Sequence, residues 1–225
     1  HRDLHSFPTR RSSVLWQSVR IWERVRQYGV LSGPGTMPLF TFVGRLTAQK
    51  GVDILLEALF EFLRDEAPLQ ALVFGAGESG LERQLERLSE SERGWGRLCF
   101  LKGYDPAVAN QVYAAGDFFL IPSRYEPCGL TDYIAQLLGN LPIVHRVGGL
   151  VKVLDGETGF SYIDNSADSL AGAMRRAMGV YASGPEAVAR MQVAAVECID
   201  REYTWKTVMG AYVQLYRESM RRWQD

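Results

Sequence analysis

Short apolar runs alternate with longer amphipathic stretches from residue 39 onward, and this alternation limits the possible folds most narrowly. The amphipathic stretches carry apolar residues at three- and four-residue spacing, as in Val52, Leu55 and Leu59. Apolar runs of strand length that alternate with helical patterns are typical of a parallel sheet covered by helices. We therefore predict a doubly wound α/β domain. The expected strands are residues 39–43, 69–74, 98–101, 118–121, 141–144 and 159–162.

The pattern changes after residue 160, where only helices are predicted beyond the short strand at residues 159–162. Asn165 and Ser166 are candidates for the N-cap of the first of them. The expected helices are residues 166–180, 185–199 and 205–223. No linker long enough to separate two domains interrupts the chain, so we expect one domain with a helical tail.

The start of the chain differs from the rest. The chain opens with His1 and its first methionine is Met37, so we expect a piece of a longer protein. The opening residues are rich in Arg and Ser and have no apolar core of a secretory signal. The expected segments are 1–13, non-native or disordered; 14–38, a leading helix and loop; 39–202, the α/β domain; and 203–225, a C-terminal helix.

The charge balance excludes several classes of partner. Lys and Arg total 25 against 26 Asp and Glu, which gives no long-range attraction for nucleic acid or an anionic membrane. Cys99, Cys128 and Cys198 form no metal-binding or disulfide pattern. No apolar run approaches the roughly 20 residues that span a bilayer. We predict a cytoplasmic protein with no metal, no cofactor and no nucleic-acid or membrane partner.

Two cations border the turn after the first predicted strand. Arg45 and Lys50 lie between Gly44 and Gly51, where a helix is predicted to begin. Arg donates parallel hydrogen bonds to phosphate oxygens, Lys supplies a compact charge, and a helix N-terminus offers free N–H groups. The turn therefore fits a diphosphate. The alternative is a pair of solvated surface cations ahead of a helix.

A glycine-rich turn at residues 75–80 follows the second predicted strand, with Gly77 inside it. Such a turn lets the backbone approach a ligand, but a dinucleotide site also needs an acidic residue about 20 positions later. The next strand ends at Leu101, Lys102 and Gly103, so we predict no NAD site. Tyr104 then follows, and its ring can stack on a purine or simply pack at the strand end.

The strongest functional signal follows the fourth predicted strand, in P-S-R-Y-E-P-C-G-L-T at residues 122–131. Pro127 and Gly129 are predicted in the first turn of a helix, whose N–H groups then point into the crevice. A carboxylate beside an anion site suits a sugar diphosphate. The alternative is an ordinary acidic residue at a helix N-terminus. The candidate ligands are Glu126 and the backbone at Cys128, Gly129, Leu130 and Thr131.

His145 follows the fifth predicted strand and precedes the glycine turn V-G-G-L at residues 147–150. An imidazole at this position has two interpretations, as a proton donor or as a structural residue. We favour the structural one, because a lone histidine after a strand is more often structural.

Taken in order, these motifs resemble those of the glycogen and starch synthases, which are retaining glucosyltransferases of the GT-B fold. The resemblance runs from about residue 14 to the end and implies one Rossmann-like half of a two-domain enzyme. Related GT-B transferases carry a second Glu at the position of Ile134, which favours the synthases. The matching segments are F-V-G-R-L-T-A-Q-K-G at 42–51, G-A-G at 75–77, G-Y-D at 103–105, P-S-R-Y-E-P-C-G-L-T at 122–131, V-G-G-L at 147–150 and T-G-F at 158–160.

The resemblance implies glucosyl transfer from ADP-glucose to the non-reducing end of an α-1,4-glucan, with retention of anomeric configuration. It assigns Glu126 as the catalytic residue. By this resemblance, Glu126 and the backbone at residues 128–131 together hold the glucose and the distal phosphate of the donor. The resemblance assigns Arg45 and Lys50 to the donor phosphates and Tyr104 to the adenine. The glycine turn that contains Gly77 is assigned to the donor as well.

In that family an N-terminal domain carries the acceptor site and closes onto the donor-binding domain. Nothing before residue 39 can encode such a domain, so we expect this chain to bind nucleotide sugar and to transfer nothing by itself. Two alternatives stay open. One is another retaining GT-B transferase that uses UDP-glucose or a different acceptor, and the other is a non-catalytic nucleotide-binding module.

Overall fold

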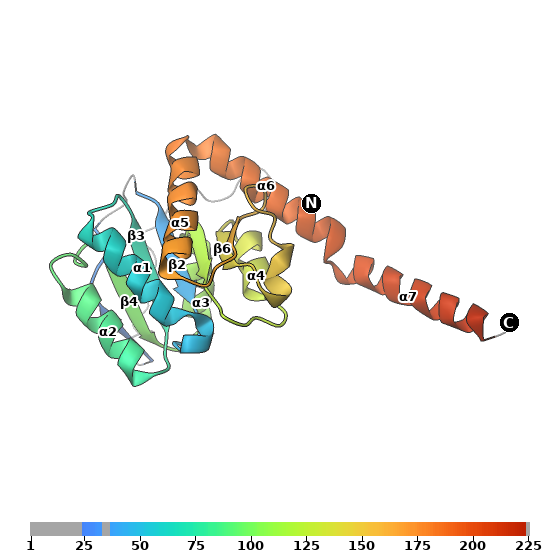
Figure 1. Ribbon diagram of the computed structural model, residues 1–225, viewed down its shortest axis with the longest axis horizontal. Coiled ribbons are helices and arrows are strands. Elements are labelled where there is room, and N and C mark those ends of the chain that lie inside the picture. Colours follow the sequence, from blue (N-terminus) through green and yellow to red (C-terminus); the bar gives the residue numbers. More distant parts are fainter. Residues whose placement is uncertain (1–23, 33–36, 224–225) are drawn as a thin grey trace.

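The computed structural model describes residues 24–32 and 37–223, which build a seven-stranded sheet with helices on both faces (Figure 1). The strand order is β1-β4-β3-β2-β5-β6-β7, and all neighbours are parallel except β1 and β4. The predicted doubly wound α/β fold with a helical tail is confirmed. The strands are β1 Val25–Tyr28, β2 Leu39–Val43, β3 Gln70–Gly75, β4 Leu98–Gly103, β5 Phe118–Ile121, β6 Leu141–His145 and β7 Phe160–Tyr162.

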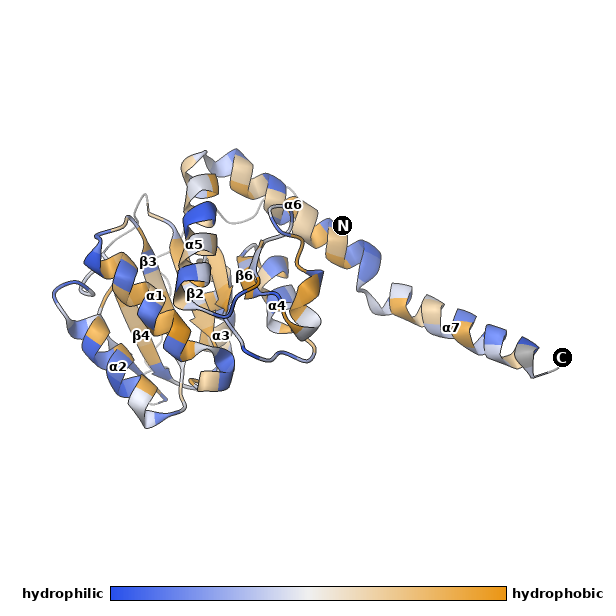
Figure 2. Ribbon diagram, in the orientation of Figure 1, coloured by the Kyte–Doolittle hydropathy of each residue, from blue (hydrophilic) through white to orange (hydrophobic). Residues whose placement is uncertain are grey.

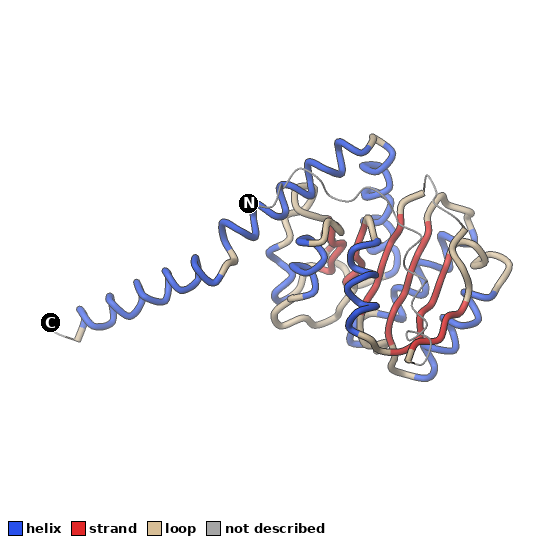
Figure 3. Tube along the Cα trace, turned by 180° about the vertical axis from the view of Figure 1, so that it is seen from behind, coloured by secondary structure: helices blue, strands red, loops and turns tan. Residues whose placement is uncertain are grey.

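Two layers of helices enclose the sheet. Helices α1, α2 and α5 cover one face, and α3 and α4 cover the other, which Figure 3 shows from behind. Short 3₁₀ turns η3 (Ala48–Lys50) and η4 (Gly148–Lys152) follow β2 and β6. The helices are α1 Val52–Arg64, α2 Ser79–Glu90, α3 Pro106–Ala115, α4 Thr131–Leu137, α5 Ala167–Ala182, α6 Pro185–Glu202 and α7 Trp205–Arg222.

The main core lies between the sheet and α1, α2 and α5. Phe40 of β2 and Phe118 of β5 are register neighbours, fully buried, with ring centroids 5.2 Å apart. Leu55 and Leu59 of α1 are also fully buried, as their helical spacing predicts. Burying one side chain of this size contributes about 1.5–3 kcal/mol. Figure 2 shows the apolar strands and the amphipathic helices that form this core.

Side-chain caps begin several helices at the positions that the sequence indicates. The hydroxyl of Ser166 accepts a hydrogen bond from the N–H of Ser169 at 3.2 Å, so α5 begins one residue later. Asp105 accepts from the N–H of Ala107 at 2.9 Å, and Pro106 occupies the first turn of α3. These caps fix where the helices begin after their loops.

The edge strand β1 is the main departure from the sequence prediction. A leading helix and loop were expected over residues 14–38, but residues 25–28 form a strand antiparallel to β4. Val25 pairs with Gly103 and Tyr28 with Phe100, which also extends β4 two residues beyond its predicted end. Pairing with a distant strand, rather than a local pattern, orders this segment. The segment expected at residues 1–13, and residues 14–23 after it, lie outside the described residues.

Candidate functional site

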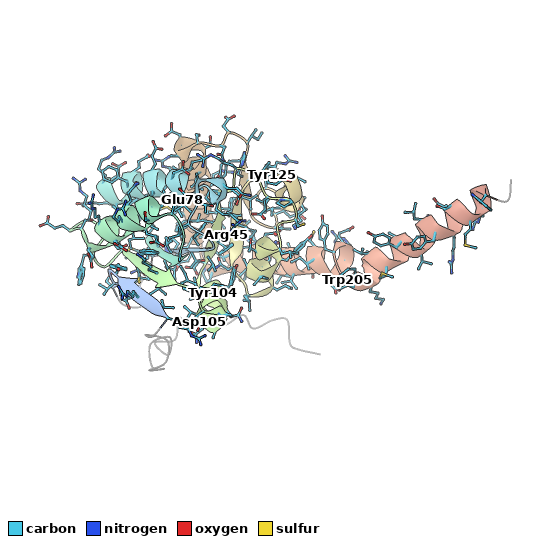
Figure 4. The ribbon with its side chains drawn as sticks, turned by 90° about the horizontal axis from the view of Figure 1, so that it is seen from below. Arg45, Glu78, Tyr104, Asp105, Tyr125 and Trp205 are labelled. Carbon is cyan, nitrogen blue, oxygen red and sulfur yellow. The ribbon has the colours of Figure 1, made fainter. Side chains whose placement is uncertain are left out.

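The candidate site lies where the strand order reverses. The chain runs from β2 outward to β3 and β4, and then returns to β5 on the other side of β2. In open α/β sheets this switch point leaves a crevice at the carboxyl ends of the strands, where ligands bind. The loop that follows β2 and the loop that follows β5 border this crevice. Figure 4 views this edge of the sheet and labels Arg45, Tyr104 and Tyr125 on it.

An ion pair joins the two loops across the switch point. Nζ of Lys50 lies 2.5 Å from Oε2 of Glu126, and the hydroxyl of Ser123 donates to the same oxygen at 3.1 Å. Only 12% of the Glu126 side chain is exposed. Within the described part of the chain no hydrogen bond uses Oε1 of Glu126, which leaves that oxygen to accept from a ligand hydroxyl.

Arg45 differs from Lys50 in its surroundings. Its side chain is exposed, and across residues 24–32 and 37–223 its guanidinium has no ion pair and no hydrogen bond. A guanidinium free of protein partners keeps all five of its N–H donors for an anion. The structure thus brings Arg45, Lys50 and Glu126 to one crevice, with Arg45 free and Lys50 engaged.

Backbone contacts join the loop after β2 to the loop after β5. Gly51 has φ of 69°, and a Cβ there would lie 2.0 Å from the carbonyl oxygen of Pro122, so only glycine fits. The N–H of Arg124 donates to the carbonyl of Gln49 at 2.9 Å. The Arg124 guanidinium also makes two hydrogen bonds to Asp53, at 2.7 and 2.6 Å, which lower the pKa of that carboxyl. The position of Lys50 therefore depends on the loop after β5.

The helix after β5 begins later than the sequence predicts. α4 starts at Thr131, so Pro127 and Gly129 lie in the preceding loop rather than in the first helical turn. Gly129 has φ of 65°, a left-handed conformation that cannot continue a right-handed helix. Cys128 and Leu130 are exposed on this loop and Thr131 is partly exposed. Cys128 and Gly129 thus lie in a loop, whereas Leu130 is the N-cap and Thr131 the first residue of α4, so the predicted anion contacts would come from the end of the loop and the start of the helix.

The glycine pair of V-G-G-L holds a third loop against this segment. The N–H of Gly149 donates to the carbonyl of Glu126 at 2.8 Å. A Cβ at Gly149 would lie 2.1 Å from the carbonyl oxygen of Cys128, and one at Gly148 would lie 2.2 Å from that of Glu126. These two glycines are therefore required for the close approach of the loop after β6.

A buried charge pair beneath this loop was missed by the sequence prediction. Asp132 is fully buried, and its Oδ1 lies 3.3 Å from Nζ of Lys152. Burial raises the pKa of Asp132 to about 6, against the opposing charge of Lys152, and burial lowers the pKa of Lys152. The available signal was two opposite charges, Asp132 at the start of the helix after β5 and Lys152 in the turn after the neighbouring strand β6. Their contact depends on the tertiary fold.

Gly77 packs closely against the backbone of Leu46, in the loop after β2. A Cβ there would lie 2.3 Å from the carbonyl oxygen of Leu46, with which Gly77 forms a parallel bridge. Its N–H donates to Oε1 of Glu82 at 2.9 Å. A Cβ at Gly75 would lie 1.9 Å from the carbonyl oxygen of Gly44. The glycine turn thus supports the loop after β2, and contact of Gly77 with a ligand stays a prediction.

Tyr104 lies after β4 and is 77% exposed. Asp105 is the N-cap of α3 immediately after it, and Pro106 is the first residue of that helix. An exposed ring at this edge offers its face to a planar base. The packing alternative does not fit this exposure.

His145 has a structural environment. Its Nδ1 lies 2.8 Å from the carbonyl oxygen of Ser123, and its Nε2 lies 3.0 Å from that of Ile163. Both ring nitrogens therefore face backbone acceptors and neither faces the crevice. The contacts link the loops after β5 and β7.

Among the described residues, no group of three or more His, Cys, Asp or Glu side chains could hold a metal ion. No helix in the same part of the chain is long and apolar enough to cross a membrane.

Comparisons with known proteins identify the family and its fold. Residues 37–179, more than half of the chain, match the model of the family described as glycosyl transferases group 1. The glycogen synthase of Aeromonas hydrophila is 37% identical over 193 residues, which cover 83% of this chain and 38% of that protein. The glycogen synthase of Lacticaseibacillus casei is 38% identical over 189 residues, covering 81% of this chain and 38% of that protein.

A solved structure shares the fold. The catalytic domain of starch synthase IV from Arabidopsis thaliana, bound to ADP and acarbose, superposes with a TM-score of 0.71 at 28% identity. The match covers 85% of this chain and 40% of that one. The chain belongs to the glycosyl transferases group 1 family. The predicted resemblance to glycogen and starch synthases is confirmed, and the chain spans about two fifths of the length of these relatives.

Proposed function

We propose that this chain is the donor-binding half of a glycogen or starch synthase, which transfers glucose from ADP-glucose to the non-reducing end of an α-1,4-glucan. The observation that carries the proposal is the crevice between β2 and β5, where a free guanidinium, a lysine and a buried carboxylate meet. Arg45 comes from one side of the switch point and Glu126 from the other. Such a site suits a ligand with both a diphosphate and sugar hydroxyls.

The chemistry requires that negative charge on the departing diphosphate be stabilised. Arg45 and Lys50 supply preorganised positive charge on one side of the crevice. Oε2 of Glu126 is engaged by Lys50 and Ser123, so its Oε1 accepts from a glucose hydroxyl and orients the sugar. The backbone at residues 128–131, where the loop after β5 leads into α4, then meets the distal phosphate with its N–H groups. Transfer proceeds with retention of configuration at the glucose.

Two observations favour an adenine nucleotide. The Arabidopsis starch synthase that shares this fold was solved with ADP. In this chain Tyr104 presents an exposed ring beside the crevice, which suits stacking on a purine. The cysteines of the described residues are all free, which fits the reducing cytoplasm that we propose for the protein.

The remainder of the parent protein is the proposed partner. Helix α7 extends away from the sheet in Figure 1 and carries an exposed apolar stripe at helical spacing. Its members are Trp205, Met209, Tyr212, Tyr216 and Met220. An uncovered stripe of this kind marks an interaction surface. We propose that it packs on the part of the enzyme that carries the acceptor site, and that this chain transfers no glucose without it.

Calorimetric titration with ADP, ADP-glucose and UDP-glucose tests the donor assignment. ADP-glucose should bind more tightly than UDP-glucose, and Tyr104→Ala should remove most of that difference because it removes the stacking face. Equal binding of both sugar nucleotides would favour a transferase with another donor. Failure of every nucleotide to bind at millimolar concentration would contradict donor binding altogether. Glucan elongation by the purified chain would overturn the proposed inactivity.

A further inference from the structure

Lys152 makes four contacts, two with the loop that borders the candidate site and two with the first turn of α4. Its Nζ donates to the carbonyl of Cys128 at 2.9 Å and to that of Gly129 at 2.5 Å. The same nitrogen lies 3.3 Å from Oδ1 of Asp132 and 3.6 Å from the ring centroid of Tyr133. One ammonium group, from the turn after β6, therefore contacts two residues of the loop after β5 and two residues of α4.

Two successive carbonyls turned toward one cation fix two successive peptide planes. In a trans peptide the N–H points away from the C=O, so the N–H groups of Gly129 and Leu130 point away from Lys152. Gly129 has φ of 65° and Leu130 has φ of −85°, so the two residues have opposite hand. Backbone of alternating hand brings successive N–H groups into a concavity that binds anions. Lys152 thus orients the N–H groups without facing the anion itself.

Burial of the Asp132–Lys152 ion pair costs free energy, which argues that the pair does more than fill space. Asp132 is fully buried and 11% of the Lys152 side chain is exposed, so both charges are removed from water. Burying two charges costs energy that their attraction repays only in part, and apolar residues of similar size are often more stabilising. The pair also packs closely on Gly129, because a Cβ there would lie 2.9 Å from Cδ2 of Leu150 and 3.2 Å from Oδ1 of Asp132. The buried ion pair therefore lowers the stability of the protein relative to apolar residues, while it fixes the conformation of the loop after β5.

We propose that Lys152, held in place by Asp132, is a positioning residue that orients the N–H groups of Gly129 and Leu130 toward the diphosphate of the donor. This inference rests on the proposed function, since it concerns the same crevice. It assigns Lys152 no direct contact with the ligand, because its ammonium is surrounded by protein partners. Its removal should therefore weaken diphosphate binding through the loop.

The decisive variant removes both charges together. Lys152→Met by itself leaves Asp132 buried and unpaired and can unfold the protein, whereas Lys152→Met with Asp132→Asn leaves no buried charge. The double variant should remain folded by thermal unfolding, and its affinity for ADP should fall about tenfold. Affinity for AMP should change little, because the reoriented N–H groups meet the distal phosphate. Arg175→Met, which breaks an exposed ion pair with Glu61, is the matched control and should bind ADP normally.

Amide NMR gives a readout that a merely structural role would not change. ADP should shift the N–H signals of Gly129 and Leu130 in the wild-type chain, and these shifts should be lost in the folded double variant, while the Tyr104 signal still responds. A folded double variant that binds ADP as tightly as the wild type overturns the inference and leaves donor binding intact. A wild-type chain that binds neither ADP nor ADP-glucose overturns the proposed function, and this inference with it.

Discussion

The ammonium group of Lys50 lies 2.5 Å from Oε2 of Glu126, so a cation predicted to bind phosphate is paired with the carboxylate predicted to bind sugar. The two residues come from loops on opposite sides of the topological switch point. Ligand binding at this crevice therefore perturbs an existing ion pair, and substitutions on either side affect both stability and binding.

Lys50→Met should destabilise the protein by about 1–3 kcal/mol, because it leaves the mostly buried Glu126 without its positive partner. Adding Glu126→Gln should recover part of that loss, since the neutral amide can still accept from Ser123. Urea unfolding of the single and double variants measures this coupling. Strictly additive losses would show that the pair contributes nothing to stability.

Arg45→Ala should leave stability within about 0.5 kcal/mol of the wild type, because the side chain is exposed and has no partner among the described residues. Its affinity for ADP should fall about tenfold and become less sensitive to salt, since a phosphate-binding cation is lost. Calorimetry at two ionic strengths checks both effects. Arg201→Ala, whose exposed guanidinium pairs with Glu202 on helix α6, is the control and should leave ADP affinity unchanged.

Arg124→Ala should weaken ADP binding severalfold although Arg124 is not assigned to the ligand. Its guanidinium bonds to Asp53 and to the carbonyl of Ala48, which holds the turn that carries Lys50. The loss of stability should stay below about 1 kcal/mol, because the ion pair is substantially exposed. Unchanged ADP affinity would show that the Lys50 turn keeps its position without this contact.

Asp132 should make stability depend on pH in a defined direction. Burial raises its pKa from 3.8 to about 6, so the folded state binds the proton more tightly than the unfolded state. Its stabilising contribution is complete below about pH 4 and is lost as pH rises through about 6, an effect of about 3 kcal/mol. Relative to Asp132→Asn, the wild type should gain stability between pH 6.5 and 4. Urea midpoints that keep a constant difference across this range would contradict the raised pKa.

Helix α7 should drive reversible self-association of the isolated chain, because its apolar stripe is exposed. Tyr216→Lys with Met220→Lys should reduce the association seen by sedimentation equilibrium. Gln214→Lys is a matched control on the same helix, outside the stripe, and should have little effect. A chain that stays monomeric at high concentration would remove self-association as a property of this surface.

Local patterns were sufficient wherever a physical rule acts over a few residues. The apolar runs predicted six of the seven described strands, and Ser166 and Asp105 began their helices as capping rules require. β1 was missed because Val25 to Tyr28 become a strand only by pairing with β4, which lies far along the chain. The start of α4 was misplaced because Gly129 adopts a left-handed conformation in a loop that contacts Lys152, from the distant turn after β6.

The same division holds at the candidate site. The sequence by itself determined the class of fold, the family motifs and the residues that follow each strand, since periodicity, capping and glycine turns are properties of neighbouring residues. Only the tertiary structure decided that Lys50 pairs with Glu126 and that Lys152 lies between Asp132 and the carbonyls of the loop after β5. Those relationships join residues from different strands, and they exist because a parallel sheet brings the carboxyl ends of its strands to one edge.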